Sequence, residues 1–150
     1  RATRALTKEL KLLQHMNHPK VNTITDIILP SKHKFNDIYI FQPKMDTSLR
    51  KVIDSRQILS ERHKTYFIYQ ISCALSYIHS CGIIHGNLSP NCIYINAADC
   101  KLRIRDFSCA VSSKSTKPVS TKYYNRYYTA PELYLCPDDH NLITNKIDIW

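Results

Sequence analysis

The chain has 150 residues, 43% of them hydrophobic, so it is about the size of one domain and can bury a core. No apolar run approaches the ~20 residues of a membrane helix, and the start of the chain is unlike a signal peptide, so no membrane association is expected. The formal net charge is +9, but the 21 Lys and Arg residues are scattered along the chain, which argues against a specific nucleic-acid module.

The first forty-odd residues predict a helix followed by two strands. Leucines at helical spacing predict an amphipathic helix over residues 3–15, and Pro19 lies just beyond it. Residues 21–29 and 38–41 are β-branched and apolar, and Pro30 interrupts the connection between them. This strand-loop-strand order predicts an antiparallel pair.

A second helix is predicted from its start and stop signals. Ser60 is a good N-cap, and Glu61 follows in the first turn. Gly82 stands just past the predicted end, where a left-handed residue commonly closes a helix. Between these ends, apolar residues recur at helical spacing: Phe67, Ile71, Leu75 and Ile78.

The second half of the chain predicts a hairpin, a long loop and the beginning of a helix. Ile93–Ile95 and Leu102–Ile104 flank the tetrapeptide N-A-A-D at 96–99, as expected for two strands of a hairpin. Residues 108–124 are polar and rich in Ser, Thr and Lys, which predicts a long exposed loop of the kind that is usually functional. Residues 146–150 are interpreted as the first turn of a helix.

The cysteines and glycines of the chain argue against disulfide bonds, a zinc site and a Gly-rich phosphate loop. Because no secretory signal is visible, we expect reduced thiols in a cytoplasmic protein, with the nucleus as the other compartment. The chain does not begin with methionine, which suggests an excerpt of a longer protein, and its two glycines cannot form a Gly-rich phosphate loop. Neither C-x-x-C nor zinc-ligand spacing occurs among the six cysteines, Cys73, Cys81, Cys92, Cys100, Cys109 and Cys136.

Four short motifs occur along the chain, and their order and spacing are informative. They read I-I-H-G-N-L-S-P-N-C at 83–92, R-D-F-S at 105–108, T-A-P-E at 129–132 and D-I-W at 148–150. The series resembles the protein kinases, whose catalytic loop reads H-R-D-L-K-P-x-N, whose metal motif reads D-F-G and whose later anchor reads A-P-E. Residues 7–19 and 35–46 are most similar to the mitogen-activated subfamily.

The resemblance covers essentially the whole chain and implies a partial, α+β, protein kinase-like fold. Residues 1–45 would supply the helix, strands and hinge at the end of the small lobe. Residues 46–150 would supply the first half of the mainly helical large lobe, up to the start of its central helix. A Gly-rich loop and a phosphate-contacting Lys would precede Arg1.

The resemblance also implies that the phosphoryl-transfer loop is altered. Asn87 stands at the position of the catalytic Asp, Ser89 at that of the loop Lys and Cys92 at that of the magnesium-binding Asn. An amide is no base, and loss of a positioned base costs on the order of 10²–10⁴ in rate. Sulfur suits magnesium poorly as a ligand. Asp106 keeps the metal-binding carboxylate, while Ser108 replaces the Gly of the metal motif.

By the same resemblance, Glu9 is the helix Glu that pairs with the phosphate-contacting Lys. Gln42 fits the gatekeeper position, and Pro43 to Met45 the hinge. A hinge Pro keeps its carbonyl, so a contact with adenine remains available.

Two further residues leave nucleotide binding open. Tyr94 lies where an aliphatic residue forms the floor under adenine, and its phenol could fill the pocket. Arg105 would face the same pocket and could pair with Asp106 or with phosphates.

Structural positions of the family are better kept. Asp148 matches the Asp that holds the catalytic-loop backbone, while Gly86 replaces the Arg that meets a phosphorylated loop. The hydrophobic stack of an assembled kinase would consist of Leu13, Ile24, His85 and Phe107.

Thr121 and Tyr123 resemble the T-x-Y phosphorylation pair of the subfamily, although they lie one residue closer to A-P-E than expected. The favoured alternative is a solvated loop without phosphorylation.

These features support a pseudokinase that acts through its surface as a scaffold or allosteric partner of signalling proteins. The main alternative is a divergent, active Ser/Thr kinase that uses ATP and magnesium. A third is a segment with no stable fold of its own, in which case the isolated 150 residues would be poorly soluble.

Overall fold

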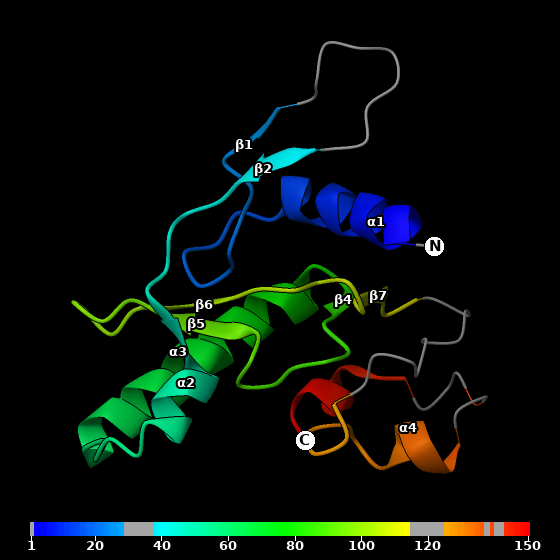
Figure 1. Ribbon diagram of the computed structural model, residues 1–150. Coiled ribbons are helices and arrows are strands. Elements are labelled where there is room, and N and C mark those ends of the chain that lie inside the picture. Colours follow the sequence, from blue (N-terminus) through cyan, green and yellow to red (C-terminus); the bar gives the residue numbers. More distant parts are fainter. Residues whose placement is uncertain (1, 29–37, 115–124, 137–138, 140–142) are drawn as a thin grey trace.

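The computed structural model describes residues 2–28, 38–114, 125–136, 139 and 143–150. Helices and antiparallel strands both occur, so the predicted α+β class is confirmed. In Figure 1, α1 and the β1–β2 pair lie on one side of the β5–β6 hairpin, and α2 and α3 lie on the other. The elements are α1 (Ala2–His15), β1 (Asp26–Ile28), β2 (Tyr39–Phe41), β3 (Thr47–Ser48), α2 (Leu49–Asp54), α3 (Glu61–Ser80), β4 (Ile83–Ile84), β5 (Ile93–Ile95), β6 (Leu102–Ile104), β7 (Val111–Ser112), α4 (Glu132–Leu135) and the 3-10 helix η3 (Asn145–Asp148).

The first strand, Asp26–Ile28, is shorter than the apolar segment 21–29 from which it was predicted. β1 pairs antiparallel with β2 as expected, with Ile27 opposite Ile40. The N–H of Thr25 still donates to the carbonyl of Phe41 at 2.8 Å, but Val21 and Asn22 do not join this pair, because they bond to β6 instead. The N–H of Asn22 donates to the carbonyl of Ile104 at 2.9 Å, and Val21 forms an isolated bridge with that residue.

The second predicted helix and the hairpin are confirmed. The N–H of His63 donates to Ser60 Oγ at 3.4 Å at the start of α3. At its end, Gly82 adopts a φ of +68°, the left-handed conformation that glycine tolerates best. In the hairpin, Tyr94 of β5 lies opposite Arg103 of β6.

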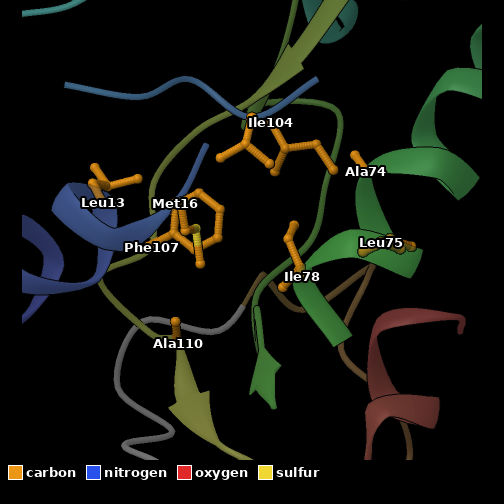
Figure 2. Packing of buried hydrophobic residues seen from close by; sticks show 9 residues of the cluster. Leu13, Met16, Ala74, Leu75, Ile78, Ile104, Phe107 and Ala110 are labelled. Atoms are coloured by element: carbon orange, nitrogen blue, oxygen red, sulfur yellow. The ribbon is translucent and has the colours of Figure 1, made fainter. Parts of the chain in front are cut away.

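One buried cluster joins α1 to α3 and to the segment after β6. Figure 2 shows Leu13 of α1, and Met16 just after the end of α1, beside Phe107, with Ile78 of α3 and Ile104 of β6 facing them. Phe107, Ile78 and Ile104 are fully buried. Residues between Leu13 and Ala110 therefore share one hydrophobic core.

Other elements differ from the sequence prediction. The expected loop 108–124 contains a strand near its start, β7, which pairs antiparallel with β4 so that Ile84 lies opposite Val111. Residues 115–124, including Thr121 and Tyr123, lie outside the described residues. The expected helical turn near the end is the 3-10 helix η3. None of the six cysteines forms a disulfide, and no helix in the described ranges is long and apolar enough to span a bilayer.

Asn22 is an unusual core residue. Its side chain is fully buried, and neither Nδ2 nor Oδ1 has a hydrogen-bond partner among the described residues. A buried polar group without a partner costs about 1–3 kcal/mol.

We therefore expect Asn22→Leu, a change of similar shape, to raise the free energy of unfolding of the full-length protein by about 1–3 kcal/mol. Urea denaturation measures the change. The control is Asn17→Leu at an exposed position, where the same substitution should have little effect. A loss of stability in Asn22→Leu would mean that Asn22 has a partner such as a buried water.

Candidate functional site

A buried carboxylate fixes the turn that carries most of the predicted catalytic positions. Asp148 Oδ2 accepts the N–H of His85 at 2.8 Å, and its Oδ1 accepts the N–H of Gly86 at 2.8 Å. His79 Nε2 also lies 2.8 Å from Asp148 Oδ2. Hydrogen bonds to an ionised acceptor are stronger than neutral ones, so η3 holds the backbone of a turn more than sixty residues earlier.

The four residues of the predicted stack lie in or against the shared core. The rings of His85 and Phe107 are 5.0 Å apart between centroids and are tilted by 58°. Leu13 belongs to the same buried cluster as Phe107, and Ile24 packs against that cluster, partly buried. His85 Nε2 donates to the carbonyl of Arg105 at 3.1 Å. The fully buried imidazole is therefore a packed, hydrogen-bonded side chain.

Two features of the structure favour a glycine at position 86: its backbone conformation and the close approach of Cys109. Its φ is +78°, and a Cβ placed on it would come within 3.0 Å of the carbonyl oxygen of Cys109. The Arg that the family resemblance would place here would thus need both a left-handed backbone and a shift of Cys109.

We expect Gly86→Ala to lower the free energy of unfolding of the full-length protein by at least about 1–2 kcal/mol. Gly82→Ala is the matched control, because its φ is also positive but its Cβ would approach only Ser113 Oγ, at 3.4 Å. Thermal denaturation should show the larger loss for Gly86→Ala. Equal losses would mean that the approach of Cys109 adds nothing to the backbone strain.

Cys92 turns its thiol into the loop. Its Sγ donates to the carbonyl of Ser89 at 3.0 Å and accepts the N–H of Ser89 at 3.1 Å. Burial raises the pKa of the Cys92 thiol to about 11, so the group is protonated at neutral pH. Sulfur is also a poor ligand for magnesium, which prefers oxygen. Ser89 is itself buried, and the pair closes the turn.

Asn87 contacts the segment that precedes T-A-P-E. Its Oδ1 accepts the N–H of Asn125 at 3.3 Å. No sequence pattern singles out Asn125, since an isolated Asn belongs to no motif. The amide at the catalytic position is therefore engaged with a backbone group that comes from the other side of the long polar loop.

Asp106 and Glu9 also have partners within the chain. Asp106 is exposed and adopts a φ of +64°. Its Oδ1 accepts a hydrogen bond from the Ser108 hydroxyl at 2.6 Å. Glu9 Oε1 accepts the N–H of Phe107 at 3.0 Å, and burial, the largest influence, raises the pKa of this carboxyl. A Gly at position 108 would have no hydroxyl to offer to Asp106.

A polar cavity of about 260 Å³ collects most of the predicted nucleotide-binding residues. Arg105 crosses it: its Nη2 donates to Gln42 Oε1 at 2.9 Å, and its Cζ lies 4.5 Å from the centroid of the Tyr94 ring. The ion pairs among the described residues do not include one between Arg105 and Asp106, which was one of the two possibilities left open by the sequence. Pro43 and Met45 do not line the cavity, and Asn91 was not predicted. The lining consists of Glu9, Gln42, Asn91, Cys92, Tyr94, Arg105 and Asp106.

Comparison with known proteins decides the family. The model of the protein kinase domain matches residues 1–150. This chain belongs to the protein kinase family. It is 43% identical over 144 residues to mitogen-activated protein kinase 13 of Arabidopsis thaliana, which is 95% of this chain and 39% of that protein. It is 44% identical over 144 residues to mitogen-activated protein kinase 4a of Physcomitrium patens, covering 95% of this chain and 37% of that protein.

A rice relative gives the same result: mitogen-activated protein kinase 1 of Oryza sativa subsp. japonica is 42% identical over 144 residues, which is 35% of its length. This kinase chain thus spans less than two fifths of the length of these curated relatives. The similarity to mitogen-activated protein kinases that the motifs predicted is confirmed.

The family generally uses ATP and magnesium, but the described residues of this kinase chain fit that complex poorly. Magnesium prefers oxygen ligands, and the loop supplies the protonated thiol of Cys92. Asp106 offers a carboxylate, one oxygen of which already accepts a hydroxyl. In the described ranges, no group of three or more His, Cys, Asp or Glu side chains is arranged to hold a metal. Between Gln42 and Tyr94, the space is taken by the Arg105 guanidinium.

Proposed function

We propose that this kinase domain is catalytically impaired, and that the protein acts through its folded surface as a pseudokinase scaffold or allosteric partner in a signalling cascade. The observation that carries the proposal is the chemistry of one turn. At Asn87, Ser89 and Cys92, an amide, a hydroxyl and a protonated thiol stand where phosphoryl transfer needs a base, a cation and an oxygen ligand for magnesium.

The contacts of that turn support the same proposal. The Cys92 thiol bonds to Ser89, and the Asn87 amide accepts a backbone N–H from Asn125. Each of these side chains has a structural partner, so none of them is held ready for a substrate. The anchoring by Asp148 meanwhile keeps the turn folded, as a stable binding surface requires.

A divergent, active Ser/Thr kinase is the second candidate, favoured by the assembled core. Leu13, His85 and Phe107 pack as the family resemblance predicts for an assembled kinase, and Asp106 retains a carboxylate at the cavity. Such an enzyme would need ATP and magnesium, and positioning of the substrates would have to supply most of its rate.

A phosphotransfer assay on the full-length protein tests the two candidates. Radiolabelled ATP with magnesium is supplied together with a general protein substrate, and an active mitogen-activated protein kinase serves as the positive control. We expect no more incorporation than with the Asp106→Ala variant. Incorporation at an ordinary kinase rate that Asp106→Ala abolishes would establish the second candidate instead.

We further propose that the protein resides in the cytoplasm, with the nucleus as the alternative. Imaging of the full-length protein fused to a fluorescent tag would test this. A secreted or organellar signal would contradict it.

A further inference from the structure

We propose that Arg105 is an internal plug: its guanidinium occupies the slot between Gln42 and Tyr94 and excludes a purine ring from it. The inference deepens the proposed function, on which it rests for the identity of the slot, because it assigns a cause to weak nucleotide binding at the same site. The class of ligand excluded is an adenine nucleotide.

The backbone of Arg105 is fixed on both sides, which aims the side chain into the cavity. The N–H of Arg105 donates to the carbonyl of Cys92 at 2.8 Å, and the carbonyl of Arg105 accepts Nε2–H of His85 at 3.1 Å. His85 is in turn fully buried and held by Asp148 through its N–H. The position of the plug is therefore set by the same contacts that hold the catalytic turn.

The guanidinium uses the two kinds of surface that a purine would need. It lies over the aromatic face of Tyr94 at 4.5 Å and takes the Oε1 acceptor of Gln42 at 2.9 Å. A planar guanidinium can stack and donate in its own plane at the same time. A purine ring entering the slot would have to break both interactions.

The opposite role, in which Arg105 attracts phosphate groups, is less consistent with its contacts. Its side chain bonds to a neutral amide and stacks on an uncharged ring. Among the described residues it has no ion pair with Glu9 or Asp106, the two acidic side chains that line the cavity. The guanidinium is thus turned toward the Gln42–Tyr94 slot.

Titration of the full-length protein with a fluorescent ATP analogue, followed by displacement with ATP, tests the plug. We expect Arg105→Ala to bind the analogue at least tenfold more tightly than the wild type, which corresponds to about 1.4 kcal/mol. Thermal denaturation verifies that each variant folds, and Arg105→Met, which keeps an apolar stem, replaces Arg105→Ala if that variant does not.

Arg103→Ala is the matched control for the loss of one positive charge. Arg103 lies two residues earlier, donates to the carbonyl of Val21 at 3.4 Å and does not line the cavity. The Arg103→Ala variant should bind the analogue with the same affinity as the wild type. A similar gain in Arg103→Ala and Arg105→Ala would overturn the plug, because net charge would then explain both.

The remaining outcomes separate the plug from the proposed function. Equal or weaker binding by Arg105→Ala overturns the plug, including the case in which neither it nor the wild type binds, and leaves impaired catalysis intact. Rapid phosphotransfer by the wild type overturns the proposed function, whereas the ratio of affinities between Arg105→Ala and the wild type still decides the plug.

Discussion

Replacing Asp148 with alanine is expected to lower the free energy of unfolding of the full-length protein by about 2–6 kcal/mol. The carboxylate is fully buried and accepts the N–H groups of His85 and Gly86, each at 2.8 Å. Without it, both donors stay buried with no partner, and each such donor costs about 1–3 kcal/mol. The loss should appear in urea or thermal denaturation.

Two further variants make this expectation specific. Asp148→Asn keeps one side-chain oxygen as an acceptor, so its loss should be smaller than that of Asp148→Ala. Asp54→Ala removes an exposed Asp that pairs with Arg50 at 2.9 Å, and it should change stability little, because exposed ion pairs contribute little. Equal effects of Asp148→Ala and Asp54→Ala would contradict the anchoring role.

Phe107→Ala should destabilise the full-length protein by about 3–5 kcal/mol, because it empties a large volume in a fully buried cluster. The cavity would lie beside Leu13, Met16 and Ile78, between α1 and α3. Chemical denaturation monitored by circular dichroism measures the loss.

The control is Phe41→Ala on β2, where the ring is 49% exposed and less surface is lost from the core. Phe107→Leu fills most of the volume and should cost clearly less than Phe107→Ala. If Phe41→Ala were as damaging as Phe107→Ala, the shared core would not be the main link between α1 and α3.

The sequence predicts the longer elements well because their signals are local. Ser60 and Gly82 mark the two ends of α3, and the apolar spacing between them needs no tertiary information. The hairpin of β5 and β6 follows from two short segments, each with Ile or Leu at both ends, on either side of a turn that begins with Asn96 and includes Asp99. The order of the short motifs along the chain likewise predicted the family, since each motif is read directly from neighbouring residues.

Short elements escaped prediction because their partners are distant in the sequence. β4 and β7 have two residues each, too few for a periodic pattern. Their paired residues Ile84 and Val111 are 27 positions apart in the sequence (111 − 84). The first strand begins at Asp26 and not at Val21, because Val21 and Asn22 bond to Ile104.

The amino-acid sequence by itself determined which chemical groups stand at the motif positions: an amide at Asn87, a hydroxyl at Ser89, a thiol at Cys92 and a guanidinium at Arg105. Only the tertiary structure decided what those groups do with their hydrogen-bonding capacity. The thiol closes its own loop, and the guanidinium reaches Gln42, 63 residues earlier, in place of the adjacent Asp106. Such choices depend on which acceptors the fold brings within about 3 Å, a distance that sequence separation does not predict.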